Sequence, residues 1–160
     1  MLLIDVRIKN YKCILDSETF SIDQLTCLVG KNESGKSAIL QALYKLNPVD
    51  KEDTYDALYE YPKMYQTDFE AGLIEDGDTV VISRWKFTAE EIEALEKQFG
   101  TDFIGDSTVV TISNGYKNKR TWDFDANFHA LFGKKMEECG FEPSDRAQIP
   151  SYDSIGEVRA

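Results

Sequence analysis

Eight consecutive residues combine the residue types and the spacing that phosphate binding requires. They fit the pattern G-x-x-x-x-G-K-[ST] of a phosphate-binding loop, or P-loop. In such a loop, successive backbone N–H groups surround a polyphosphate, and the start of the following helix adds the positive end of its dipole. The sequence therefore predicts a polyphosphate site, formed by Gly30, Lys31, Asn32, Glu33, Ser34, Gly35, Lys36 and Ser37.

Several positions of this loop have distinct expected roles. Gly30 and Gly35 permit backbone angles and close approaches that a Cβ atom would block. Lys36 brings a positive charge to the β- and γ-phosphates and is the expected catalytic residue, while the Ser37 hydroxyl is placed to ligate Mg²⁺. The expected ligands are therefore ATP and Mg²⁺. The alternative is a glycine-rich turn that contains Gly-Lys-Ser by chance.

The segments on both sides of the loop agree with the motif, because a P-loop follows a buried strand and opens a helix. Residues 25–29, Leu-Thr-Cys-Leu-Val, predict a short buried strand, in which Cys27 is expected to be a small core residue. Residues 38–46 are rich in helix formers and are followed by Asn47-Pro48, which predicts a helix that ends there. Both flanks favour the phosphate site over the chance match.

Composition limits the class of protein. The length of 160 residues fits one domain or a piece of a larger one. No run reaches the roughly 18 apolar residues that a membrane span needs, and the N-terminus lacks the features of a signal peptide. Cys13, Cys27 and Cys139 are too widely spaced for a disulfide framework or a zinc motif. We therefore expect a cytoplasmic protein without a membrane partner.

The charge balance argues against a broad contact with DNA. Twenty-nine acidic residues face 18 Lys and Arg, for a net charge of −11, whereas a nucleic-acid-binding face usually carries a basic patch. The favoured interpretation of the basic hairpin residues is a solvated edge whose charges prevent aggregation. We expect any DNA contact elsewhere in the full protein. The local positive clusters are Arg7, Lys9 and Lys12 near the start, and Lys117, Lys119 and Arg120 on the hairpin.

Two strands are expected before the strand that leads into the P-loop. Residues 2–9 alternate between apolar and charged side chains, which is typical of a half-exposed strand, and residues 18–22 form the second. Residues 50–66 follow no regular pattern. We expect there a loop with one helical turn that packs its tyrosines on the domain and begins with a solvated acidic run.

The remaining sequence is rich in strand and turn signals. Thr88-Ala89-Glu90-Glu91 is a capping box that predicts a helix to about Phe99, ended by Gly100. Asn114-Gly115 is a strong hairpin signal. The other expected elements are strands over 69–74, 79–87, 107–113 and 116–124, a turn over 75–78, a helix from Asp125 to about Cys139, and a loop over 141–160.

The order of two strands, a buried strand, the P-loop and a helix resembles the N-terminal lobe of ABC-type ATPases. The chain looks most like the SMC/RecF-like and OLD-like (overcoming-lysogenisation-defect) AAA-type ATPases of DNA repair and phage defence. Residues 8–14, Ile-Lys-Asn-Tyr-Lys-Cys-Ile, are similar to that family's opening pattern I-x-N-[FY]-[KR]. The resemblance, specific over residues 1–48, implies an α/β P-loop NTPase lobe with a mixed sheet and an antiparallel β side sheet, as in an ABC or SMC head.

The resemblance also implies roles for individual residues. Asn32 would lie near the terminal phosphate. Asn10, Tyr11 and Lys12 would line the base or ribose side of the nucleotide, with Lys12 near a phosphate; an ordinary polar strand end is the alternative for these three. Gln66 would be the glutamine that senses Mg²⁺ and the terminal phosphate.

The family's other catalytic parts are missing from the sequence. Leu73-Ile74-Glu75-Asp76 is better interpreted as a hairpin end than as a Walker B strand, and no Leu-Ser-Gly-Gly-type signature motif occurs. His129 lies on a predicted amphipathic helix and is expected to be packed or exposed rather than catalytic. We therefore expect the N-terminal part of a longer ATPase, or a chain that needs a partner. The resemblance implies ATP bound between two heads, in a head-to-head homodimer or with a partner chain, and negligible hydrolysis by residues 1–160 alone.

The expected organisation has four parts: a nucleotide-binding core over 1–48, an irregular loop over 49–67, a β-rich and helical lobe over 68–140, and a loop over 141–160. Two other functions compete with the ATPase lobe. A small P-loop phosphotransferase is disfavoured, because strands precede the P-loop and the candidate lid, 50–66, has no arginine. A non-catalytic, nucleotide-responsive interaction module stays open because the Walker B strand is missing.

Overall fold

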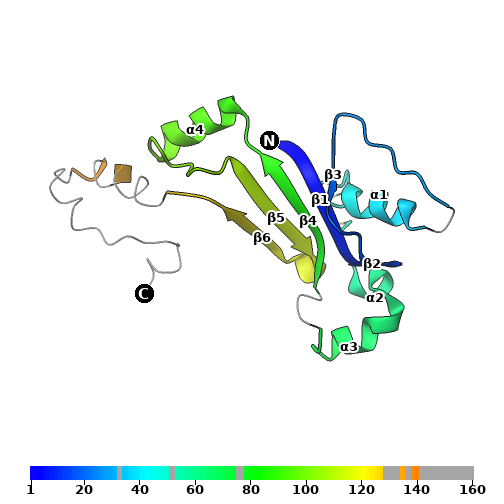
Figure 1. Ribbon diagram of the computed structural model, residues 1–160. Helices are drawn as coiled ribbons and strands as arrows, with labels where there is room; N and C mark the ends of the chain where they lie inside the picture. The colour runs from blue at the N-terminus through cyan, green and yellow to red at the C-terminus, as the bar shows by residue number, and fades with distance from the viewer. Residues whose placement is uncertain (32–33, 51–52, 75–77, 128–133, 136–137, 141–160) are drawn as a thin grey trace. The chain divides into compact units, whose positions relative to one another are not determined.

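The structure, a computed structural model, describes residues 1–31, 34–50, 53–74, 78–127, 134–135 and 138–140. The chain divides into two compact units. Of the described residues, the larger unit contains those within 3–85 and 111–123, which include the described part of the P-loop, and the smaller unit contains residues 1–2, 86–110, 124–127, 134–135 and 138–140. Figure 1 follows the elements in chain order.

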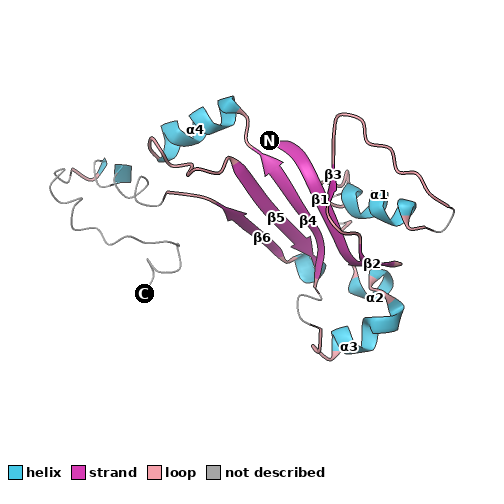
Figure 2. Cartoon of the chain, in the orientation of Figure 1, coloured by secondary structure: helices cyan, strands magenta, loops and turns pink. Residues whose placement is uncertain are grey.

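A six-stranded sheet has the strand order β2-β1-β4-β5-β6, and β3 also pairs with β1 (Figure 2). β1 is antiparallel to both β2 and β3. β4 is antiparallel to β5, because N–H···O bonds join Phe87 to Thr108 and Tyr116 to Asp78. The α/β class is confirmed, but the described sheet is antiparallel rather than mixed. The strand bounds are β1 Leu2–Tyr11, β2 Ile14–Asp16, β3 Phe20–Ser21, β4 Thr79–Lys86, β5 Val109–Gly115 and β6 Arg120–Phe124.

β1 confirms the expected alternation of apolar and charged side chains. Its apolar residues Val6 and Ile8 are fully buried. On the charged side, Asp5 pairs with Arg84 of β4, and Arg7 pairs with Asp16 of β2. The Arg7 hydrogen bond holds the pKa of Asp16 at about 2. Cross-strand ion pairs therefore neutralise the side of β1 that the apolar core does not cover.

The core of the larger unit is built from strands and three helices: α1 (Lys36–Tyr44), α2 (Ala57–Glu60) and α3 (Gln66–Glu70). A short 3₁₀ helix, η1 (Lys63–Tyr65), links α2 to α3. Tyr55 and Tyr61 of the irregular segment enter this core as expected, whereas Tyr59 and Tyr65 are exposed. The buried core residues are Ile8, Tyr11, Ala38, Ala42, Tyr55, Tyr61, Val80, Val81 and Tyr116.

The smaller unit contains α4 (Ala89–Phe99) and confirms the expected capping box. The Thr88 hydroxyl accepts from the Glu91 N–H at 3.3 Å, and the Glu91 carboxylate accepts from the Thr88 N–H at 2.9 Å. Gly100 follows the helix as expected. Phe103 is buried, and its ring centroid lies 4.9 Å from that of Phe99.

Residues 25–29 are not a strand, so that prediction is wrong. Leu25 and Val29 are 91% and 89% exposed, and Cys27 is exposed rather than part of the core. A strand needs a neighbour that accepts and donates its backbone hydrogen bonds, and no described strand pairs with this segment. The P-loop is therefore preceded by an apolar segment that the described residues leave uncovered.

The expected strand over 69–74 is also wrong, because α3 occupies its first part. Phe69 stacks on Tyr61 with ring centroids 4.2 Å apart, so tertiary packing overrides the local strand signal. Glu75 and Asp76 lie outside the described residues.

The hairpin between β5 and β6 turns later than expected. The turn is a 3₁₀ segment, η2 (Tyr116–Asn118), in which Lys117 and Asn118 adopt φ values of 59° and 55°. Gly115 is extended and belongs to β5. A Cβ atom on Gly115 would lie 1.9 Å from the Asp78 carbonyl oxygen, so this glycine permits a close backbone approach rather than the turn.

The helix expected from Asp125 to Cys139 lies largely outside the described residues, as does His129. Asp125 does not cap a helix, because its carboxylate accepts from the Ser107 N–H at 3.2 Å and Ala126 forms a bridge with Ile104. The loop expected over 141–160 also lies outside the described residues. Among the helices in the described part of the chain, none has the length and apolar character needed to cross a membrane.

Candidate functional site: a phosphate-binding loop

The P-loop ends where α1 begins. Gly35 precedes the helix with φ 89° and ψ 2°, a left-handed conformation that favours glycine. No side chain caps the start of α1, and its first turn contains no acidic residue. The first N–H groups of a helix have no partner within the helix, so this end of α1 offers donors to an anion.

The ammonium group of Lys36 folds back over the loop. Its Nζ donates to the carbonyl oxygens of Gly30 at 2.8 Å and Lys31 at 2.5 Å, and lies 3.4 Å from the Ser34 hydroxyl. These partners are uncharged, and no described carboxylate forms an ion pair with Lys36. A positive charge held by neutral groups beside a helix start suits an anionic ligand.

Two of the described loop residues, Gly30 and Ser34, lie close together. A Cβ atom on Gly30 would lie 2.9 Å from the Ser34 hydroxyl oxygen, so glycine lets the loop close there. Ser37 is exposed in the first turn of α1, and its hydroxyl is the oxygen donor that fits Mg²⁺. Among the residues the structure describes, no cluster of three or more His, Cys, Asp or Glu side chains could hold a metal. Asn32 and Glu33 lie outside the described residues.

The turn between β1 and β2 lies beside α1. The Sγ of Cys13 and the Cγ1 of Ile14 are 3.5 Å and 3.4 Å from the position that a Cβ on Gly35 would occupy. Further along the helix, Lys12 Nζ donates to the Gln41 side chain at 2.6 Å. The structure therefore places Lys12 against the second half of α1, and its approach to a phosphate stays a prediction.

The Asn10 carbonyl and the Tyr11 side chain contact the core. The Asn10 carbonyl accepts from the Tyr116 hydroxyl at 2.6 Å, and the Asn10 backbone is left-handed, with φ 51°. Tyr11 is fully buried, and its hydroxyl donates to Glu60 at 2.8 Å. The expectation that Tyr11 lines the nucleotide is therefore wrong for its side chain, which belongs to the core.

Gln66 begins α3 and is directed toward its own helix. Its side-chain amide donates to the Glu70 carboxylate at 3.1 Å. None of the described hydrogen bonds of Gln66 reaches the P-loop, so its role as a metal-sensing residue stays a prediction.

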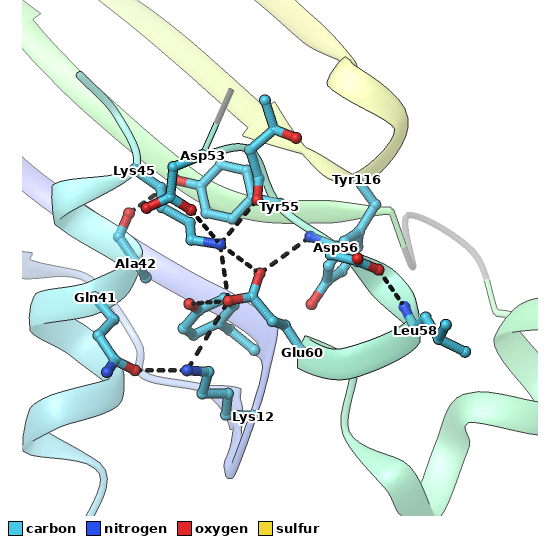
Figure 3. A network of polar contacts seen from close by, with 12 residues as sticks. Lys12, Gln41, Ala42, Lys45, Asp53, Tyr55, Asp56, Leu58, Glu60 and Tyr116 are labelled. Carbon is cyan, nitrogen blue, oxygen red and sulfur yellow. Dashed lines mark hydrogen bonds and ion pairs between the residues drawn. The ribbon is translucent and has the colours of Figure 1, made fainter. Parts of the chain in front are cut away.

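A buried polar network at the far end of α1 was not expected from the sequence (Figure 3). Glu60 of α2 is only 8% exposed. Its two carboxylate oxygens each lie 2.9 Å from Lys45 Nζ, at the end of α1. One of them also accepts from the Tyr11 hydroxyl, and the other accepts from the Asp56 N–H at 3.0 Å. No sequence motif marks these residues, because they meet only in the folded chain.

Both members of this ion pair stay charged in the fold. Burial raises the pKa of Glu60, but hydrogen bonds from Lys45, the Asp56 N–H and Tyr11 outweigh it, so the net pKa is below its ordinary value. Burial lowers the pKa of Lys45, but its hydrogen bonds to Glu60 and Asp53 outweigh that effect and raise it. The buried charges are therefore compensated, as buried charges must be.

The described part of the loop has three features that suit a phosphate site: glycines at positions 30 and 35, an uncapped helix start and a lysine held over the loop. The family model described as AAA ATPase domain matches residues 1–145. The chain therefore belongs to the AAA ATPase domain family, which confirms the expected AAA-type P-loop ATPase and implies the use of a nucleotide, usually with Mg²⁺. No curated protein gives a significant sequence match.

Proposed function

We propose that this chain is an ATP-binding lobe that takes Mg²⁺·ATP at the P-loop. The observation that supports this most strongly is the Lys36 ammonium, which is bound only to uncharged groups among the described residues and lies beside the uncapped start of α1. In this proposal the α1 N–H groups and Lys36 bind the phosphates, and Ser37 ligates the metal.

The chemistry supplied by bound Mg²⁺·ATP is transfer of its terminal phosphoryl group to water. The residues of this chain bind and orient the phosphates and place a positive charge where negative charge develops. The Asp and Glu of a Walker B strand are missing from the sequence. Residues 1–160 would therefore form an ATP-binding half-site, with negligible hydrolysis on their own.

The parts needed for hydrolysis would come from a partner chain or from a second copy in a head-to-head dimer. The uncovered segment 25–29 supports this proposal, because Leu25 and Val29 expose apolar side chains just before the P-loop. Covering such residues removes apolar surface from water, which favours association.

We also propose which kind of AAA ATPase this chain is. The similarity of residues 8–14 to the SMC/RecF-like and OLD-like opening pattern supports an ATPase of that kind, acting in DNA repair or phage defence in the cytoplasm. An antiparallel sheet beside a P-loop agrees with the side sheet of such heads.

A titration with a fluorescent ATP analogue in the presence of Mg²⁺ tests the function. Lys36→Ala removes the charge over the loop, and Lys97→Ala on the exposed side of α4 is the control. Hydrogen bonds to charged groups contribute about 1.5–3 kcal/mol, so Lys36→Ala should weaken binding by at least about tenfold. Equal binding by wild type and Lys36→Ala, or none by either, would contradict the proposed function.

A further inference from the structure

The polar network around Glu60 joins α1 to the β1–β2 turn. That turn contacts Gly35, which directly precedes α1. We propose that Glu60 is a positioning residue for the nucleotide site, which fixes α1 and the β1–β2 turn so that the start of α1 and Lys36 face the polyphosphate. This inference rests on the proposed function, because it assigns a role in binding ATP to a residue that does not touch it.

Glu60 first fixes the end of α1 opposite the P-loop. Lys45 follows the last turn of α1, and its ammonium group is surrounded by acceptors: Glu60 on both oxygens at 2.9 Å, Asp53 at 3.0 Å and the Thr54 carbonyl at 2.8 Å. The Tyr55 hydroxyl adds a bond to the Ala42 carbonyl at 2.8 Å. A helix of this length spans about 13 Å. Fixing its far end therefore sets the direction in which its start points.

Glu60 also holds the β1–β2 turn. Its carboxylate accepts from the Tyr11 hydroxyl at 2.8 Å, and its backbone carbonyl accepts from the Lys12 N–H at 2.6 Å. The next residues of this turn, Cys13 and Ile14, lie against Gly35. One residue of α2 thus connects to Gly35 by two routes, through the turn and through α1. Figure 3 shows the contacts of Glu60 with Lys12 and Lys45 and the bond from Lys12 to Gln41.

The carboxylate is needed for this double role because it accepts on both oxygens. A glutamine at this position keeps the size but presents an NH₂ group to Lys45 in either orientation, and with it to the Tyr11 hydroxyl or to the Asp56 N–H. Lys45, whose side chain is 12% exposed, would then keep only Asp53 as a charged partner. A buried charge that loses its partner is strongly unfavourable, so the end of α1 would move to reach water.

The experiment compares wild type, Glu60→Gln and Tyr11→Phe, with Glu93→Gln on the exposed side of α4 as the matched charge control. Calorimetric titration with Mg²⁺·ATP, at a temperature where each variant is folded by circular dichroism, gives affinity and stoichiometry. Hydrogen exchange without nucleotide reports how readily the backbone hydrogen bonds of residues 36–45 open. A role confined to global stability would lower the melting temperature without changing the affinity of the folded fraction.

We expect Glu60→Gln to bind ATP about fivefold or more weakly at unchanged stoichiometry, with faster exchange over 36–45 and unchanged exchange over 89–99. Tyr11→Phe should show a smaller effect in the same direction, and Glu93→Gln none. Affinity within about twofold of wild type for Glu60→Gln would overturn the inference. If Glu60→Gln does not fold, an ATP affinity of Tyr11→Phe within about twofold of wild type would overturn the inference. If wild type binds no ATP, the proposed function fails by itself, and unchanged exchange over 36–45 in the variants overturns the positioning role.

Discussion

Lys36 Nζ lies 2.8 Å from the carbonyl oxygen of Gly30, the first residue of the P-loop. This bond closes the loop with a positive charge on its inner side. It depends on two backbone features: a left-handed Gly35 directly before Lys36, and a glycine at position 30 that leaves room for Ser34. The described residues of the loop, 30–31 and 34–36, therefore meet around the Lys36 ammonium group.

Gly35→Ala should weaken both the fold and the site. Gly35 has φ 89°, and a left-handed backbone costs about 1–2 kcal/mol for a residue with a Cβ atom, which corresponds to a fall in Tm of about 2–8 °C. A shift of Gly35 toward ordinary angles would also disturb the start of α1 and reduce ATP affinity.

Gly72→Ala is the matched control for that variant. Gly72 has φ 70°, and a Cβ atom there would meet nothing within 4 Å. The same backbone strain then arises outside the P-loop, so Tm should fall without a change in ATP affinity. Thermal melts and ATP titrations of both variants check this, and equal affinity losses in the two would contradict a specific role for Gly35.

Several elements could be predicted from sequence because local signals and packing agree. The capping box of α4 needs only residues that are close in the sequence, and the alternation in β1 matches the burial of one side of that strand. Residues 36–44 form a helix for the same reason, since a run of helix formers follows the left-handed Gly35. The P-loop itself could be predicted because its chemistry requires adjacent residues.

The predictions from sequence fail where the local structure depends on residues that are far apart in the chain. Residues 25–29 have strand composition, but a strand also needs a neighbour. Asn114-Gly115 predicts a turn, yet the lack of a Cβ atom on Gly115 serves the approach to Asp78, 37 positions earlier in the sequence. The Glu60 network is of the same kind, because Tyr11, Lys45 and Glu60 become neighbours only after folding.

Purified residues 1–160 should hydrolyse ATP negligibly, because the sequence lacks the Walker B carboxylates that hold the metal and orient water. A phosphate-release assay with wild type and Lys36→Ala checks this at saturating Mg²⁺·ATP. Turnover at an ordinary enzyme rate of about 1 s⁻¹ or faster, lost in Lys36→Ala, would show that this chain contains a catalytic centre.

Residues 1–160 should not bind duplex DNA at about 150 mM salt, with or without ATP. The basic residues of the hairpin already have partners: Lys119 pairs with Asp78 at 2.8 Å, Arg120 lies over the Trp122 ring at 4.6 Å, and Lys117 lies over the Phe69 ring at 5.5 Å. Fluorescence anisotropy with labelled duplex checks this. A micromolar complex that is lost on changing Lys117, Lys119 and Arg120 to Ala would make the hairpin a DNA contact.

Acid should destabilise the fold through both Glu60 and Asp16. The folded-state pKa of Glu60 is lowered from its ordinary value of about 4.5. Its charged form therefore contributes stability that is present above that pH and is lost as the pH falls through the lowered pKa. Asp16, with a pKa of about 2, loses its contribution as the pH falls toward that value.

Urea unfolding of wild type and Glu60→Gln between about pH 7 and pH 2 isolates the contribution of Glu60. Glu60→Gln should be less stable at neutral pH by about 3 kcal/mol, and its stability should fall less steeply over the upper part of the acid range. Identical pH profiles for the two proteins would show that Glu60 is not charged and paired in the folded state.

The most direct test of the central claim is hydrogen exchange measured with and without Mg²⁺·ATP, because it reports where the nucleotide binds. ATP should slow exchange of the amides at the start of α1, residues 36–38, and leave α4, residues 89–99, unchanged. The protection should be absent in Lys36→Ala. Protection confined to other segments, or equal protection in Lys36→Ala, would contradict an ATP site at this P-loop.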